Sequence, residues 1–208
     1  MKSSTGKIDL QELLSKDPKV KYGCANRAIA VSRENPEALY PDFGVFLKLL
    51  EGDNKILKWS AIQIIGNLSK VDSQKKVDAT IPHLIALLSD KTMVTAANAI
   101  GALSEIAKNK AEHQEMILGA LLKVEKAKYY HKGELSPECT NVAIGHVIQC
   151  LEQFGKPVYQ RNDVQNFLKR QTKNTRPKVK LMAEQLLDKS SQEKPGRKSH
   201  GKGGTHVN

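Results

Sequence analysis

Hydrophobic and polar positions alternate with a helical period in residues 80–108. Apolar side chains occur at Ile81, Leu84, Ile85, Leu87 and Leu88, and again at Val94, Ala97, Ile100, Leu103 and Ile106. Steps of three and four residues keep them on one face of a helix with 3.6 residues per turn. Asp90, between the two runs, is suited to cap the second helix by accepting hydrogen bonds from its first-turn amides. The pattern predicts two helices, each too short to be stable without neighbours.

The same pattern recurs along the chain. A leucine pair occurs at Leu13-Leu14, Leu49-Leu50, Leu87-Leu88 and Leu121-Leu122, at intervals of 36, 38 and 34 residues. An Ile-Gly step occurs inside the helix that follows, at Ile65-Gly66, Ile100-Gly101 and Ile144-Gly145. A period of this length indicates stacked pairs of helices. The three glycines share one repeat position, and we expect each to allow close approach of a neighbouring helix.

Five helix pairs are predicted. Their ranges are 8–15 with 20–33, 37–50 with 54–70, 73–88 with 90–108 (interrupted or restarted at Pro82), 111–128 with a helix opening at Ser136-Pro137-Glu138, and 158–172 with 176–189. The interval between Ile-Gly steps grows from 35 to 44 residues before Ile144. The sequence therefore predicts a lengthened loop at 129–135. Residues 190–208 have no apolar periodicity and are predicted to be disordered.

Residues 87–104, LLSDKTMVTAANAIGALS, resemble a HEAT repeat, and the turns at 17–21 and 176–180 carry the Pro, Val and basic residues common in that family. The resemblance covers most of residues 8–189. It implies an all-α fold: a right-handed, armadillo-like α-solenoid of about five antiparallel helix pairs over residues 1–189, followed by a disordered basic tail at 190–208. It also implies a non-catalytic scaffold that binds another protein on the concave row of second helices.

The alignment of the repeats makes predictions for single residues of the second helices. Trp59 aligns with Val94 and is expected on the buried side. The positions expected to be exposed on the concave face are Asn26, Lys58, Gln63, Asn67, Asn98 and Glu105.

Charge is distributed unevenly. The 208 residues carry a formal net charge of +11, yet residues 1–154 hold 20 Lys and Arg against 18 Asp and Glu. Residues 155–208 hold 13 against 4. The basic candidates for partner binding are therefore Arg161, Lys169, Arg170, Lys173 and Arg176, followed by basic residues of the tail. Through residues 155–208 they could contact phosphates of nucleic acid, an acidic partner or a membrane surface, or serve only as a solubilising terminus.

The predicted loop supplies a second group of candidates, Tyr129, Tyr130, His131 and Lys132. Tyrosine offers contact area together with a polar tip, which suits recognition. The alternative is a loop that only tolerates an insertion. A HEAT-like alkylpurine DNA glycosylase is a further alternative, but that family needs exposed aromatic side chains around an acidic residue, and we find no such group.

The sequence contains no motif for catalysis or for a cofactor. Phosphate-binding loops, Rossmann fingerprints and zinc-ligand spacings are absent, so neither a cofactor nor a metal is expected. Cys139 and Cys150 would lie roughly 16 Å apart on one helix, too far for a disulfide. Together with Cys24 they are expected to be reduced thiols. With no apolar run of membrane-spanning length and no secretory signal, we expect a cytoplasmic monomer.

Overall fold

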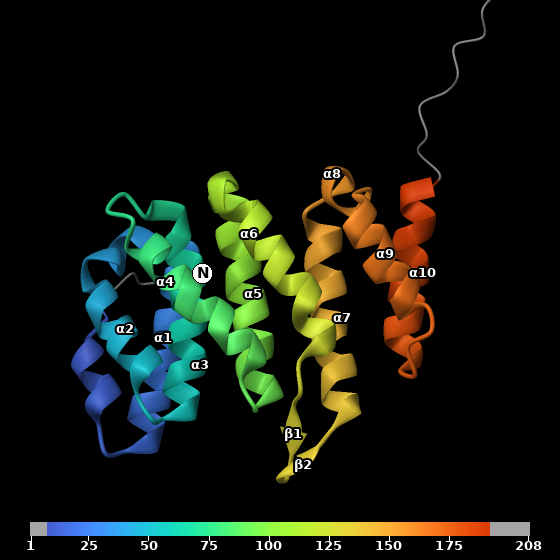
Figure 1. The fold of residues 1–208 in the computed structure, drawn as a ribbon. Helices are drawn as coiled ribbons and strands as arrows, with labels where there is room; N and C mark the ends of the chain where they lie inside the picture. The colour runs from blue at the N-terminus through green and yellow to red at the C-terminus, as the bar shows by residue number, and fades with distance from the viewer. Residues whose placement is uncertain (1–7, 192–208) are drawn as a thin grey trace, which may run out of the picture.

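Helices follow one another in a row of five antiparallel pairs in the computed structural model, which describes residues 8–191 (Figure 1). The first members of the pairs are the 3-10 helix η1 (Leu10–Leu14), α2 (Phe43–Glu51), α4 (Lys76–Ala86), α6 (Ala111–Leu122) and α9 (Asn162–Gln171). The second members are α1 (Pro18–Glu34), α3 (Lys55–Leu68), α5 (Met93–Asn109), α7 (Pro137–Gln153) and α10 (Pro177–Ser191). The predicted all-α solenoid is confirmed. The predicted tail lies outside the described residues, apart from Ser190 and Ser191, which extend α10.

Short elements connect these helices. They are η2 (Pro36–Ala38), η3 (Tyr40–Asp42), η4 (Ser69–Val71), η5 (Leu87–Ser89), η6 (Lys123–Lys126), the short helix α8 (Lys156–Tyr159), and a hairpin of β1 (Tyr130–His131) and β2 (Glu134–Leu135). No helix within residues 8–191 has both the length and the apolar character needed to cross a membrane.

Side-chain caps set several helix starts. Asp17 accepts a hydrogen bond from the Lys19 amide at the start of α1, and Ser136 accepts one from the Cys139 amide at the start of α7. Each of these two helices opens with a proline, whose missing N–H is not needed at that position. Asp90 differs from the prediction: it accepts from the amide of Thr92, which precedes α5, so it shapes the turn before the helix.

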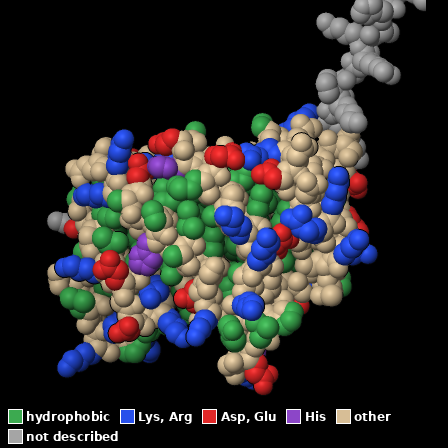
Figure 2. All heavy atoms as spheres, viewed as in Figure 1, with side chains coloured by type: hydrophobic (Ala, Val, Ile, Leu, Met, Phe, Trp, Pro, Cys, Tyr) green, Lys and Arg blue, Asp and Glu red, His purple; other side chains and the backbone are tan. Residues whose placement is uncertain are grey.

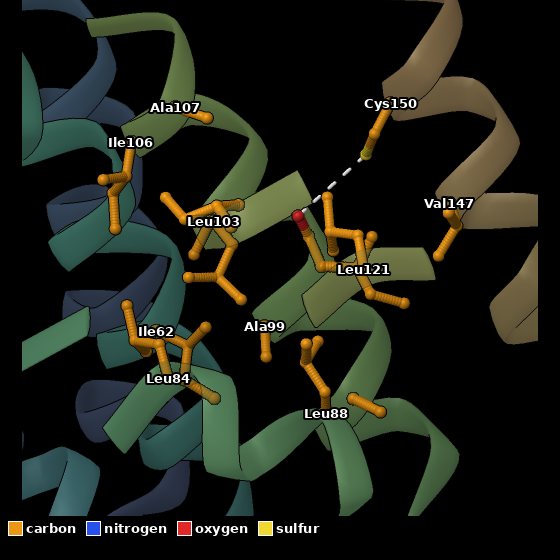
Figure 3. Close-up of a cluster of buried hydrophobic side chains, with 14 of the residues drawn as sticks. Ile62, Leu84, Leu88, Ala99, Leu103, Ile106, Ala107, Leu121, Val147 and Cys150 are labelled. Atoms are coloured by element: carbon orange, nitrogen blue, oxygen red, sulfur yellow. Dashed lines mark hydrogen bonds between the residues drawn. The ribbon is translucent and has the colours of Figure 1, made fainter. Parts of the chain in front are cut away.

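The core lies between the two rows of helices as a large cluster that runs from Ala28 to Leu186 and a small separate one of Leu13, Cys24, Ala25 and Leu57 at the N-terminal end. Successive second helices pack side by side in the order α1, α3, α5, α7, α10. Figure 3 shows how Ile62 of α3, Leu84 of α4, Leu103 of α5 and Leu121 of α6 bring four helices into one cluster. Each of these side chains is fully buried, and burying such a side chain contributes about 1.5–3 kcal/mol.

Prolines account for part of the difference from the predicted boundaries. The range 37–50 divides into η2, η3 and α2; Pro41 lies inside η3, and the α-helix begins at Phe43. Pro82, in contrast, lies inside α4 and does not interrupt it. Its neighbours Ile81 and Leu84 are fully buried, so tertiary packing holds the helix across the missing amide. The range 158–172 divides into α8 and α9.

The three cysteines are free thiols. Cys139 and Cys150 lie on α7, as predicted. Cys24 and Cys150 are buried and Cys139 is half-buried. Burial raises the pKa of the thiol in both Cys24 and Cys150, which disfavours the reactive thiolate.

A buried group of charged side chains joins the turn before α4 to the turn between α5 and α6. The Lys110 ammonium lies 3.0 Å from Asp72 Oδ2 and 2.6 Å from Asp78 Oδ1. Tyr40 Oη donates to Asp72 Oδ1 at 2.6 Å, and the Val77 amide donates to Asp72 Oδ2 at 3.1 Å. The Lys110 side chain is 9% exposed and the Asp72 side chain 0%. Lys110 is shared by both carboxylates, so its removal would leave Asp72 and Asp78 without the ammonium that pairs with them.

This cluster makes stability depend on pH. Burial alone would raise the pKa of Asp72, but hydrogen bonds from Tyr40, Val77 and Lys110 hold its pKa below the ordinary 3.8. The pKa of Asp78 is also lowered, because Lys110 and His113 outweigh the effect of burial. A lowered folded-state pKa stabilises the fold fully above the unfolded-state pKa, and this stabilisation is lost as the pH falls through the folded-state value.

We therefore expect the free energy of unfolding to decrease below about pH 4, where both carboxylates begin to take up protons. Urea denaturation between pH 2 and 7 would measure it. The matched variant D72N/D78N/K110M lacks these titrating groups and should lose less stability over the same range. If the free energy of unfolding fell equally at acid pH in the two proteins, the cluster would have no role in this pH dependence.

Candidate functional site

The second helices form the inner face of the solenoid, and a hollow of about 510 Å³ opens there. We call this hollow the inner groove. α3 contributes Gln63 and Asn67, α5 contributes residues from Ala97 to Glu105, and α7 contributes residues from His146 to Gln153. α5 packs against both α3 and α7, so it forms the floor between two walls.

Small residues of α5 make the groove hollow. Ala97 and Gly101 lie one helical turn apart and line it. Gly101 is exposed, and a Cβ added to it would meet no atom within 4 Å. The prediction that Gly101 admits a neighbouring helix is therefore wrong. The same prediction is confirmed at Gly66, where an added Cβ would lie 2.8 Å from Ala102 Cα. At Gly145 the added Cβ would lie 3.4 Å from Val179 Cγ2 of α10.

Side-chain amides of α3 link it to its two neighbouring helices, α5 and α1. Gln63 Nε2 donates to Asn98 Oδ1 at 2.9 Å, and Asn98 Nδ2 donates to the Val94 carbonyl at 2.8 Å. Asn67 Nδ2 donates to Ser32 Oγ at 2.8 Å. Asn67 is only 7% exposed, which corrects the expectation that it is an exposed concave residue. These bonds hold the amides of α3 and α5 in one orientation while leaving Gln63 Oε1 free to accept.

Trp59 lies on the same face of α3 as Gln63, one helical turn earlier. It is half-buried, and its Nε1 donates to Thr95 Oγ1 of α5 at 3.1 Å. Val94, with which it aligns in the repeat, is 39% exposed. The expectation of a buried tryptophan is thus corrected, since Trp59 offers part of its ring next to the groove.

The α7 wall is polar. Gln149 and Gln153 are exposed, and Gln153 Oε1 accepts from Lys108 Nζ at 2.7 Å. The same ammonium lies 2.8 Å from Glu105 Oε1, which neutralises the carboxylate on the floor. Burial lowers the pKa of His146 and outweighs a hydrogen bond with Gln149 that raises it, and the charge of Lys178 lowers the pKa further, so the neutral imidazole is favoured at pH 7. Arg33 and Lys70, near the C-terminal ends of α1 and α3, leave the groove positive at that end.

The predicted loop is a β-hairpin that lies against the preceding helix pair. Tyr130 pairs with Leu135 and His131 with Glu134. Lys132 and Gly133 have φ of 51° and 87°, which suits a tight two-residue turn. Tyr130, His131, Lys132 and Leu135 are exposed.

Tyr129 is not a surface residue, which corrects the expectation that it offers contact area to a partner. It is 0% exposed, and its Oη donates to the Leu88 carbonyl at 2.6 Å. The Tyr130 amide donates to the Lys91 carbonyl at 2.9 Å. Burial raises the pKa of Tyr129 to about 12. Tyr129 therefore anchors the hairpin to the turn between α4 and α5.

The predicted basic residues divide into two groups. Three arginines form ion pairs with glutamates of the fourth helix pair: Arg161 with Glu115, Arg170 with Glu125 and Arg176 with Glu138. Lys169 and Lys173 are exposed, and within residues 8–191 neither has a carboxylate at ion-pair distance. Contact of residues 155–208 with nucleic acid stays a prediction, and its tail portion, 192–208, lies outside the described residues.

Asp78, Glu112 and His113 offer three ligand atoms within 4.8 Å of one another. Asp78 Oδ1 already lies 2.6 Å from the Lys110 ammonium, which would compete with a cation for this oxygen. We therefore assign no metal to this group.

Comparison with known proteins identifies the fold. No protein-family model matches the sequence, and no curated protein matches it. A designed armadillo repeat protein superposes with a TM-score of 0.55 and 18% identity, covering 87% of this chain and 80% of its own. A computationally designed armadillo repeat protein for modular peptide recognition superposes with a TM-score of 0.54 and 18% identity, covering 86% and 79%. The MAST/Orbit N-terminal domain superposes with a TM-score of 0.48 and 15% identity, covering 89% of this chain and 83% of its own. The chain has the fold of an armadillo- or HEAT-like α-solenoid.

Proposed function

We propose that this protein is a non-catalytic scaffold that binds an extended segment of another protein in the inner groove. The observation that carries the proposal is the exposed Gly101 on the groove floor. Glycine in a helix interior costs about 1 kcal/mol relative to alanine, and no neighbouring helix needs the space here. A residue without a side chain at this point lets the backbone of a partner approach the helix closely.

The polar lining suits a peptide backbone. A side-chain amide carries a donor and an acceptor together, as does a peptide group. Gln63 and Asn98 are held in place by their mutual hydrogen bond, so little side-chain freedom is lost when a partner binds. Gln149 on the opposite wall is exposed and offers a further amide.

Trp59 would add binding energy, and the positive end of the groove would orient the bound segment. A partly exposed tryptophan next to a polar groove is typical of residues that dominate binding energy. Arg33 and Lys70 lie near the C-terminal ends of α1 and α3, where they would attract an acidic side chain of the bound segment. Similarity to a protein designed for modular peptide recognition supports the same proposal.

A display library of unstructured peptides, panned on the wild-type protein, tests the proposal. Peptides selected in this way should bind G101W at least about tenfold more weakly, because the indole would fill the groove. W59A should weaken them by a similar factor, since it removes the contact area of the ring. Fluorescence anisotropy titration of selected peptides measures both effects.

G44W is the matched control. Gly44 lies in α2, and an added Cβ would also meet nothing within 4 Å there. Binding should be unchanged in G44W. Selected peptides that bind G101W and the wild-type protein equally well would place the binding surface elsewhere and overturn the proposal.

A further inference from the structure

A second hollow, on the opposite side of the solenoid, has no part in the function proposed above. It has a volume of about 470 Å³ and lies between the end of α4 with η5 and the outer side of α6. We call it the outer groove. Its apolar lining consists of Ile85, Leu88, Met116, Gly119, Ala120 and Val124. Ser89 and Glu115 also line it, and the Glu115 carboxylate is paired with Arg161. Met116 is 48% exposed, so a large apolar side chain faces solvent here.

Gly119 leaves the outer groove open. It lies within α6, where glycine weakens a helix, and a Cβ added to it would meet no atom within 4 Å. Packing inside the protein therefore gives no reason for this glycine. A helical face that lacks one side chain between two apolar walls can accept a ridge of side chains from another helix.

Lysines border the outer groove on the side of η6. Lys123 lines it, and Lys126 follows within the same short helix. Glu125 of η6 forms an ion pair with Arg170, which holds α9 next to η6, and the neighbouring Lys169 of α9 is exposed. Within residues 8–191, no carboxylate lies at ion-pair distance from Lys123, Lys126 or Lys169. Figure 2 shows Lys and Arg side chains gathered next to a hydrophobic area of this face.

We propose that the outer groove binds an acidic amphipathic helix of a partner protein. The apolar face of the partner helix would cover Met116 and Gly119, and the carboxylates of that helix would pair with the lysines of η6 and α9. The terminal segments of this chain are poor occupants, because residues 1–7 and 192–208 are both basic. Nucleic acid would leave the apolar lining uncovered. A membrane surface receives projecting apolar side chains, whereas this site is hollow.

The test uses a display library of helix-forming peptides panned on the full chain carrying G101W, so that the inner groove cannot contribute. We expect enrichment of sequences with apolar residues at i, i+3, i+4 and i+7 and with Asp or Glu beside them. Titration by fluorescence anisotropy should show at least about tenfold weaker binding to G119W, which fills the outer groove, and to K123E/K126E, which reverses its charge.

Three results would overturn this proposal: no enrichment of helical sequences, enrichment without acidic residues, or binding that G119W leaves unchanged.

Co-sedimentation with phosphatidylserine-containing vesicles tests a membrane surface as the alternative occupant. Membrane binding that is lost in G119W would show that a lipid surface, and not a helix, occupies the outer groove. G44W again serves as the control for an added tryptophan, and circular dichroism of each variant checks the fold. Loss of peptide binding at the inner groove leaves this result unaffected, because the two libraries are selected independently.

Discussion

Replacement of Lys110 by alanine should lower the free energy of unfolding by about 3–5 kcal/mol, the loss typical when one partner of a buried ion pair is removed. In this variant Asp72 and Asp78 would remain without the ammonium group that now pairs with both of them. The Asp72 side chain has no contact with solvent. Urea denaturation at pH 7, followed by circular dichroism, measures the change. The loss is a large fraction of the stability of a domain of this size.

Two comparisons test the cause of this loss. D72N/D78N/K110M removes all three charges together and should recover most of the stability, because no unpaired charge remains. R27A breaks the exposed pair of Arg27 with Glu12 and should cost less than about 1 kcal/mol. If K110A cost no more than R27A, the cluster would contribute only as much as a surface ion pair.

The glycines of the Ile-Gly steps should respond in opposite directions to alanine. G66A places a Cβ 2.8 Å from Ala102 Cα and 2.9 Å from Ala102 Cβ, so α3 and α5 must move apart. We expect a loss of about 1–3 kcal/mol, as for other overpacked cores. G101A meets nothing within 4 Å and should stabilise the protein by up to about 1 kcal/mol, because alanine favours the helix.

Thermal and urea denaturation of the two variants would provide the measurement, and each variant is the control for the other. Equal effects at the two positions would show that the repeat pattern determines the role of these glycines. The opposite signs that we expect would show that the neighbouring atoms determine it.

These glycines also show how far the sequence predicts the structure. The repeated pattern identifies the helix pairs and their order, because the burial of one face leaves a period that a single sequence reveals. It does not reveal how far each second helix lies from the next. Gly66 and Gly101 hold equivalent positions, and only the packed structure distinguishes a contact with Ala102 from an open floor.

Less of the candidate site than of the fold can be predicted from the sequence. Tyr129 and Tyr130 are adjacent and look equivalent, yet one is fully buried and the other 40% exposed. Tyr129 is part of the hydrophobic core and donates to the carbonyl of Leu88, 41 residues earlier, and neither contact can be read from its neighbours in the sequence. The lysines of η6 were missed as members of a patch, because charges counted by segment do not show that η6 and α9 lie together.

The expected effect of a proline on a helix also fails where tertiary packing outweighs it. Pro82 would be expected to end a helix, but α4 continues through it, with Ile81 and Leu84 beside it fully buried in the core. Pro41, in contrast, lies in a short 3-10 helix, and the α-helix begins only at Phe43.

The ion pairs between the last two helix pairs give the two ends of the solenoid different sensitivity to salt. Glu115, Glu125, Glu138 and Glu152 of the fourth pair are joined to Arg161, Arg170, Arg176 and Lys189 of the fifth. Salt screens exposed charges far more than it screens buried ones. Because each pair of a solenoid contacts only its neighbours, rising ionic strength would loosen α9 and α10 first. Hydrogen exchange would then speed up at the C-terminal end while the amides of α3 and α5 stay protected, so that unfolding proceeds inward from one end.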